Sequence, residues 1–446
     1  MSKQDQKELR QQIVCEWLQE NYLNYGSLRH DVVTDRLQIR MADSLEDASL
    51  QNAPEGLQFR GKENWRNLTD KDINTMVCQC VAEKGVNIST NEMWTALKSD
   101  MVPAVHPLRA WLDGLRPYTA DQPDWIDWLA QQVRVKPSGE EAKGDKARGE
   151  ELWRTCFKKW FVAMVASWMH DEVVNHTALV LVGRQGIFKT TWLEHLIPPA
   201  LRAYSSKMPL NGQISKDDRL RLCENAMLNI DELDAICGRE MNIVKSLLTS
   251  TDVNERAAYG RLKERRMRLA SFCASTNNRE FLTDITGNRR WLPFEVESIQ
   301  NPFHITLPYE RIYAQAKALI EGGTYMYWFD LEDIEQLEKH NEDFRAQENE
   351  EQLLPILFDI PAEGKGEFMT TAEISDKLVS YGGIKKPMSI RQLGMLLAKR
   401  GFQKKQVYLS GSNVRGWIVY KRQTDEIELL KKMDSYSATS QPTDLY

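Results

Sequence analysis

The 446-residue chain has few of the residues that build disulfide frameworks or structural metal sites. Its seven cysteines are an odd number, and they lack the paired spacing of a zinc site. Cys78 and Cys80 are separated by one residue, and no second Cys or His pair lies near them in the sequence. We therefore expect reduced, mostly structural thiols.

Long apolar runs are also missing. The most apolar segment, Trp160 to Met169, is bounded by charged residues on both sides and is too short to span a bilayer. The first ten residues are polar and charged, without the apolar stretch of a secretory signal. These features predict a cytoplasmic protein with no membrane partner.

A large excess of basic charge is absent too. The formal net charge of -6 excludes a protein that coats nucleic acid by bulk attraction, although a local basic surface can still bind it. With 42% hydrophobic and 27% charged residues, the composition is that of a folded soluble protein. The length predicts a central domain with smaller flanking domains.

The pattern of elements predicts a multidomain α/β fold. Apolar positions at helical spacing dominate the N-terminal third, and a Gly-rich charged stretch follows. The domains we expect are a mostly helical N-terminal domain (1–134), a linker (135–150), an α/β core (151–330), an acidic helical connector (331–364), a basic domain (365–422) and a polar tail (423–446).

The core contains short apolar runs that end in polar residues, as buried parallel strands do. They are Ala178–Val182, Ala226–Ile230 and Leu269–Ala274. A Gly-containing turn follows the first run, and a helix is predicted from Thr190 to Leu196. Strand, loop and helix in this order are the layout that a phosphate-binding loop requires.

The turn matches the Walker A pattern. Gly183, Gly186, Lys189 and Thr190 stand at its key positions. In such a loop the backbone N–H groups and the Lys bind phosphates, while the Thr hydroxyl binds Mg²⁺. Phe188 occupies the position before the Lys where Gly is usual, which leaves hydrolysis open. The sequence therefore predicts ATP and Mg²⁺ as ligands, and a chance Gly-rich turn is the alternative.

The second apolar run ends in Asp231 and Glu232, a Walker B arrangement. Asp231 is expected to bind Mg²⁺, and Glu232 to orient and deprotonate the attacking water. The third run leads to Asn277, which we expect to orient water near the γ-phosphate. Ordinary acidic and Asn-containing turns are the alternative.

Arg289 and Arg290 lie in a short polar turn between two apolar stretches. One of them is a candidate arginine finger, which would stabilise charge at the γ-phosphate of a neighbouring subunit. This role predicts a homo-oligomeric ring. A surface salt-bridge pair is the alternative.

Two basic segments are candidates for nucleic-acid binding. The first lies between the second and third runs and contains Arg256, Tyr259, Arg261 and Lys263. The second is the basic domain, in which two helices precede a hairpin, an order that suggests a winged helix. Its candidate residues are Arg391, Lys399, Arg400 and Arg415. Solvated surface charge is the alternative for both.

The ordered motifs GRQGIFKT, NIDELD, CASTNN and TGNRRW resemble the virulence-associated protein E family, whose ATPase core is similar to superfamily 3 helicases. The resemblance is clearest from Trp160 to Val296. It implies helicase or replication-initiation work on single-stranded DNA or an origin duplex, for a phage, prophage, satellite or other mobile element, with replication proteins as possible partners. Phe188 departs from the family's usual Gly.

Three hypotheses follow. The first is an ATP-dependent DNA motor, a hexameric ring assisted by the winged helix. The second is an initiator or assembly factor that binds ATP with little hydrolysis because Phe188 distorts the loop. The third is a sequence-specific DNA-binding regulator in which the ATPase is secondary.

Overall fold

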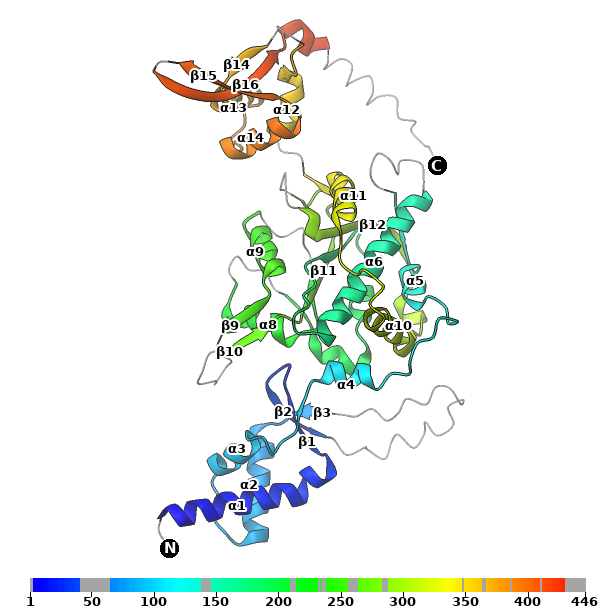
Figure 1. Cartoon of the computed structure of the whole chain (residues 1–446), viewed down its shortest axis with the longest axis vertical. Helices are drawn as coiled ribbons and strands as arrows, with labels where there is room; N and C mark the ends of the chain where they lie inside the picture. Colours follow the sequence, from blue (N-terminus) through cyan, green and yellow to red (C-terminus); the bar gives the residue numbers. More distant parts are fainter. Residues whose placement is uncertain are drawn as a thin grey trace. The chain divides into compact units, whose positions relative to one another are not determined.

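The computed structural model describes residues 3–40, 65–137, 146–208, 214–231, 233, 238–255, 264–282, 288–346, 349–362, 366–385, 387–409 and 411–429 (Figure 1). The chain divides into two compact units, one formed by Met1–Asn278 and Arg290–Leu337, the other by Arg279–Arg289 and Glu338–Tyr446. Both contain helices and sheets. The chain is therefore a multidomain α/β protein, as predicted.

The N-terminal part of the first unit combines three helices with a small mixed sheet. The helices are α1 (Lys3–Asn21), α2 (Asp70–Lys84) and α3 (Thr90–Leu97), and the sheet order is β3 (Trp65–Asn67), β2 (Arg36–Arg40), β1 (Leu28–Asp31), β4 (Ala104–Val105). Only β1 and β4 pair in parallel. We expected this part to be mostly helical and did not predict the sheet, because strands of two to five residues are too short for an alternating pattern to stand out.

A six-stranded sheet forms the centre of the first unit. Its order is β5 (Val133–Val135), β12 (Trp291–Ile299), β6 (Ala178–Val182), β11 (Ser271–Thr276), β8 (Met227–Ile230), β7 (Ser205–Lys207). All neighbours pair in parallel except β5 with β12. The three predicted runs are β6, β8 and β11. Strands β6, β8 and β11 are buried along their whole length, which explains why they read as continuous apolar runs.

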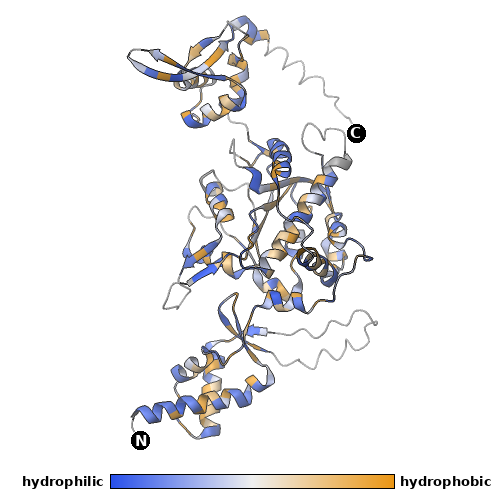
Figure 2. Ribbon diagram, viewed as in Figure 1, coloured by the Kyte–Doolittle hydropathy of each residue, from blue (hydrophilic) through white to orange (hydrophobic). Residues whose placement is uncertain are grey.

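Seven helices of this unit lie around the sheet or lead into it. They are α4 (Pro107–Asp113), α5 (Trp125–Ala130), α6 (Lys146–Met169), α7 (Lys189–His195), α8 (Lys216–Glu224), α9 (Gly238–Thr249) and α10 (Tyr309–Glu321). Short 3₁₀ turns occur at Leu23–Tyr25 (η1), Pro199–Tyr204 (η4), Asn288–Arg290 (η6) and Pro302–His304 (η7). A separate hairpin, β9 (Asp252–Glu255) with β10 (Glu264–Met267), is strongly hydrophilic (Figure 2).

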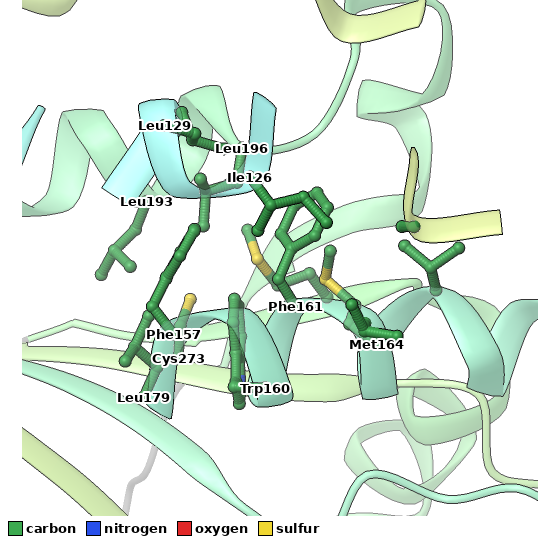
Figure 3. Close-up of a cluster of buried hydrophobic side chains, with 14 of the residues drawn as sticks. Ile126, Leu129, Phe157, Trp160, Phe161, Met164, Leu179, Leu193, Leu196 and Cys273 are labelled. Carbon is green, nitrogen blue, oxygen red and sulfur yellow. The ribbon is translucent and has the colours of Figure 1, made fainter. Parts of the chain in front are cut away.

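Helix α6 carries the core of this unit. Its side chains Phe157, Trp160, Phe161 and Met164 lie between α5, α7 and the sheet (Figure 3). All four are fully buried. Burial of aromatic side chains of this size contributes roughly 2 to 3 kcal/mol each, so this packing fixes α7 against the ends of the strands.

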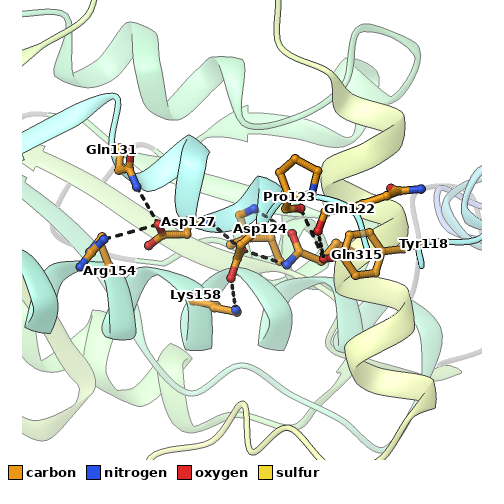
Figure 4. Close-up of polar contacts among 10 residues, drawn as sticks. Tyr118, Gln122, Pro123, Asp124, Asp127, Gln131, Arg154, Lys158 and Gln315 are labelled. Atoms are coloured by element: carbon orange, nitrogen blue, oxygen red, sulfur yellow. Dashed lines mark hydrogen bonds and ion pairs between the residues drawn. The ribbon is translucent and has the colours of Figure 1, made fainter. Parts of the chain in front are cut away.

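A polar network joins α5, α6 and α10 (Figure 4). Asp124 is the N-cap of α5 and accepts hydrogen bonds from the Asp127 backbone N–H, Lys158 Nζ and Gln315 Nε2, at 2.9, 2.6 and 2.8 Å. Arg154 forms an ion pair with Asp127. One carboxylate thus links two successive helices, α5 and α6, to the distant helix α10.

Helix α11 (Leu331–Asn341) leads from the first unit into the second. The second unit contains η8 (Glu342–Phe344), α12 (Asn349–Leu357), α13 (Thr371–Gly382) and α14 (Ile390–Lys399), with strands β13 (Phe358–Asp359), β14 (Glu367–Met369), β15 (Gln403–Leu409) and β16 (Ser412–Lys421). Strand β16 pairs antiparallel with the other three. The two helices and the hairpin expected in this region are present, with Thr370 as the N-cap of α13.

Candidate functional site

Three neighbouring parallel strands end at one edge of the central sheet. Val182 of β6 is paired with Thr276 of β11, and Ala274 of β11 is paired with Ile230 of β8. The loop after β6, Asp231 after β8 and Asn277 after β11 therefore share this edge. Because β11 lies in the middle, its polar end stands between the loop and Asp231.

The loop after β6 has the backbone conformation for which glycine is suited. Gly183 has φ +154°, which disfavours any L residue, and a Cβ there would make a tight contact of 3.1 Å with the Val296 carbonyl oxygen. The Gly183 N–H donates to the Thr276 carbonyl at 3.1 Å, which ties the loop to β11. Gly186 has φ +86° and open space around it, so only its conformation favours glycine.

Phe188 ends this loop and is the N-cap of α7, with φ +66° and ψ +18°. This is the left-handed conformation that glycine adopts without strain. The ring packs against the hydrophobic core and lies edge-to-face with Phe303, with 6.4 Å between the ring centroids. Phe188 therefore takes the backbone geometry expected of the usual Gly.

Lys189, the first residue of α7, is only 7% exposed. Its Nζ donates to the carbonyl oxygens of Gly183 and Arg184 at 2.6 and 2.8 Å, and to Asn277 Oδ1 at 3.1 Å. The structure thus brings together Lys189, the glycine loop and Asn277, as the sequence predicted. The ammonium lies inside the curve of the loop.

Next to Lys189, two hydroxyls and a carboxylate converge. Thr190 Oγ1 lies 3.1 Å from Asp231 Oδ1 and 3.0 Å from Ser275 Oγ, and Ser275 Oγ donates to the same Oδ1 at 3.1 Å. Hydroxyl and carboxylate oxygens are the ligands that Mg²⁺ prefers when it keeps several waters. The donor set fits Mg²⁺. Ser275 was not predicted, because a Ser at the end of an apolar strand gives no signal by itself.

A lysine completes this cluster. Lys207, at the end of β7, donates from Nζ to Asp231 Oδ2 at 2.7 Å and lies 3.7 Å from Glu194 Oε1. Burial alone would raise the pKa of Asp231, but hydrogen bonds from Lys207, Ser275 and Thr190 outweigh it and lower that pKa. The hydrogen bond to Asp231 in turn raises the pKa of Lys207. No motif marks Lys207, since only the register of β7 beside β8 brings it to Asp231.

Several predicted residues lie elsewhere or outside the described residues. Glu232 is outside them, as is the segment containing Arg256, Tyr259, Arg261 and Lys263. Arg290 directly precedes β12, whose first residue is paired with Ala178 at the start of β6. It therefore lies at the opposite edge of the sheet, about 20 Å along the strands from the loop. Arg289 is exposed and belongs to the second unit.

The four basic candidates of the second unit differ in their surroundings. Arg391 and Arg415 are exposed, and Arg415 Nε donates to Gln406 Oε1. Lys399 donates to Glu342 Oε1 at 2.5 Å, and Arg400 forms an ion pair with Glu351 at 3.6 Å. The C-terminal end of α14 is thus in contact with two carboxylates of the preceding acidic segment, so two of the four candidates are exposed but have acidic partners.

Within the described residues no group of three or more His, Cys, Asp or Glu side chains is placed to hold a metal ion. The thiols of the described cysteines are free. In the same residues, no helix has the length and apolarity to cross a membrane. The Mg²⁺ site inferred above depends on one carboxylate and two hydroxyls, the composition typical of a metal that shares its coordination with water and phosphate.

At one edge of the parallel sheet the structure thus brings together a glycine loop, a buried lysine and a carboxylate. Residues 142–346 match the family described as Virulence-associated protein E-like domain. The resemblance seen in the motifs is therefore confirmed for this region, which contains all four of them.

Other comparisons add little. Among solved structures the chain is similar to "The A form apo structure of NrS-1 C terminal region-CTR", at 11% identity and a TM-score of 0.42, over 89% of this chain and 98% of that chain. It is similar to "The apo structure of NrS-1 C terminal region (305-718)" at the same identity and TM-score, over 89% and 97%. No curated protein matches the chain.

Proposed function

We propose that the chain is a Mg²⁺-dependent P-loop ATPase that acts on DNA, as a helicase or translocase, in the replication of a mobile genetic element. The observation that supports this most is the convergence of Lys189, Thr190, Asp231 and Asn277 at the ends of three adjacent parallel strands. A chance Gly-rich turn would not bring Lys189 into hydrogen-bond contact with Asn277 after β11 and the adjacent Thr190 into contact with Asp231 after β8.

Each residue has a task in this mechanism. The loop N–H groups and Lys189 bind the phosphates of ATP, while Thr190 and Asp231 hold Mg²⁺. Mg²⁺ neutralises charge on the phosphates when bound. Glu232 is assigned to orient and deprotonate the attacking water, and Asn277, already hydrogen-bonded to Lys189, to position that water.

The place of Arg290 favours an assembly. Because it lies at the edge of the sheet opposite the loop, its side chain does not reach the phosphates bound in its own chain. An arginine at that edge is suited to reach the site of a neighbouring copy, where it would stabilise charge in the transition state. This position of Arg290 is what supports the homo-oligomeric ring, hexameric in our proposal.

The assignment to DNA and to mobile-element replication is drawn from the match to the virulence-associated protein E-like domain and from two basic hairpins. The hydrophilic β9–β10 hairpin flanks the segment with Arg256, Tyr259, Arg261 and Lys263. The β15–β16 hairpin carries exposed Lys404, Lys405 and Arg415, and with α13 and α14 it gives the element order of a winged helix. Both fit contact with a phosphate backbone.

The decisive test is ATP hydrolysis by the purified chain with Mg²⁺, with and without single-stranded DNA. Turnover stimulated by DNA and lost in Lys189→Ala and Glu232→Gln is expected. Lys71→Ala, which removes an exposed lysine on α2, is the matched control and should leave the rate unchanged. An undiminished rate in Lys189→Ala would refute the proposal.

The two alternative functions predict different results in these experiments. ATP binding without turnover under either condition would make the chain an initiator or assembly factor. Sequence-specific DNA binding that persists without ATP would favour a regulator. Salt-sensitive binding without base preference would count against that third reading.

A further inference from the structure

Phe303 is an exposed aromatic side chain beside the glycine loop. It belongs to the short turn η7, and 70% of its surface is open to solvent. Its ring lies edge-to-face with Phe188, at 6.4 Å and 80°, and with His195, at 5.6 Å and 88°. The Phe303 ring thus presents a large aromatic surface to solvent while two rings of the α7 region hold it in place.

The fold places this ring with precision. Glu295 of β12 is paired with Val182, the last residue of β6, so β12 continues four residues beyond the loop edge. Asn301 then caps η7, its Oδ1 accepting from the Phe303 N–H at 3.0 Å. The backbone of Phe303 is thereby fixed next to α7.

The ring of Phe303 contacts one face of the α7 region. Phe188 and His195 are seven residues apart, which is two helical turns, so they lie on the same side of α7. Phe188 directly precedes Lys189, the lysine that holds the loop. The aromatic cluster therefore begins at the residue where the proposed phosphate-binding loop ends.

We infer that Phe303, supported by Phe188 and His195, is the platform on which the base of the bound nucleotide stacks. This inference depends on the proposed nucleoside-triphosphate site and adds its base-binding part. Bases stack on aromatic rings whatever their hydrogen-bonding groups, because every base has a π-face. The platform favours ligands that have a base over bare phosphates, and it discriminates little among bases. In this arrangement the ring of Phe188 has a role in ligand binding, because it supports the ring of Phe303.

The test is calorimetric binding of two ligands, ATP and inorganic tripolyphosphate, each with Mg²⁺, to the full chain and to Phe303→Ala. Loss of a base–aromatic stack should weaken ATP binding about tenfold or more. Tripolyphosphate, which has no base, should bind the variant as it binds the wild type. Phe303→Trp should retain ATP affinity. Tyr408→Ala, which removes another ring that is 70% exposed, is the matched control and should change neither ligand.

Each other outcome has a meaning. Equal ATP affinity in wild type and Phe303→Ala would overturn the inference while leaving the triphosphate site intact. Weakening of both ligands by the same factor would also overturn it, because the effect would then lie in the phosphate loop. Failure of the wild type to bind either ligand would refute the proposed function itself. A smaller assembly in size-exclusion chromatography with unchanged ATP affinity would show that Phe303 contacts a second copy of the chain instead.

Discussion

Lys207 Nζ lies 2.7 Å from Asp231 Oδ2, so a lysine of β7 neutralises the carboxylate to which we assign Mg²⁺. The other oxygen of Asp231 lies 3.1 Å from both the Thr190 and the Ser275 hydroxyls. A metal ion bound to Asp231 would thus share its carboxylate with a fixed positive charge. In the proposed site Lys207 would compete with the metal for Asp231 and so limit metal binding before a nucleotide arrives.

Replacing Lys207 with Met should therefore strengthen metal binding in the absence of nucleotide. Lys207 is 58% exposed, so solvent screens its charge, and we expect an effect of about threefold to fivefold in Kd. Titration of Mn²⁺ followed by electron paramagnetic resonance measures this directly. Lys207→Arg keeps the charge and should behave as wild type. Weaker Mn²⁺ binding in Lys207→Met would instead mean that the lysine orders the site for the metal.

Phe188 allows the cost of its backbone to be separated from the value of its ring. Phe188→Gly and Phe188→Ala both remove the ring, but only Gly adopts φ +66° without strain. The Ala variant should therefore be less stable than the Gly variant by about 1 kcal/mol. Urea unfolding of the two variants measures this difference, and equal midpoints would contradict it.

The same Gly variant addresses hydrolysis. Since Phe188 already has the backbone conformation suited to Gly, Phe188→Gly should leave turnover at saturating ATP close to that of the wild type. The rate is measured with Mg²⁺ and single-stranded DNA. A turnover well above wild type would show that the ring impairs catalysis and would favour the initiator reading.

The second unit offers a test of where DNA binds. Arg415→Ala should weaken DNA binding and lower the slope of log affinity against log salt by about one, because it removes one exposed cation. Glu342→Gln should have the opposite effect on affinity, because it releases Lys399 from its ion pair. Fluorescence anisotropy at several salt concentrations measures both. Unchanged binding in Arg415→Ala would exclude this hairpin as a contact.

The residues of the proposed phosphate site could be located from the sequence because each follows a strand with a strong apolar signal. Val182, Ile230 and Thr276 lie at or next to the ends of those runs, and parallel pairing brings the residues after them to one edge. The order of the strands was not predictable. Ser275 and Lys207 gain their place only from the position of β11 between β6 and β8 and of β7 beside β8.

Phe303 and the short sheet of the N-terminal part were missed for different reasons. Phe303 lies in a short turn. Its position beside the glycine loop depends on β12 continuing beyond the end of β6, which the sequence does not reveal. In the sheet of β1 to β4, only β1 and β2 are neighbours in the chain, and β3 and β4 join them from distant segments. The ion pairs of Lys399 and Arg400 show a third limit, because the sequence gives the charge of a residue but not its partner in space.

A pH-dependent loss of stability should arise at His106. His106 is the N-cap of α4, and its Nδ1 accepts a hydrogen bond from the Arg109 N–H at 3.3 Å. Burial, with a further contribution from the positive charge of Arg109, lowers the pKa of His106 from 6.5 to about 4. Between pH 6.5 and about 4 the His106 side chain is protonated in the unfolded chain and neutral in the folded chain. The free energy of unfolding is therefore highest above pH 6.5 and falls as the pH drops toward 4.

His106→Asn should remove most of this loss, because Asn also caps a helix but does not titrate. Between pH 7.5 and 5 the wild type should lose up to about 2 kcal/mol more of its unfolding free energy than the variant. Urea unfolding at the two pH values measures the difference, and His304→Asn, which replaces an exposed histidine, is the control. Equal losses in wild type and His106→Asn would show that His106 is already protonated in the folded chain at pH 5, and that its hydrogen bond to the Arg109 N–H does not persist in solution.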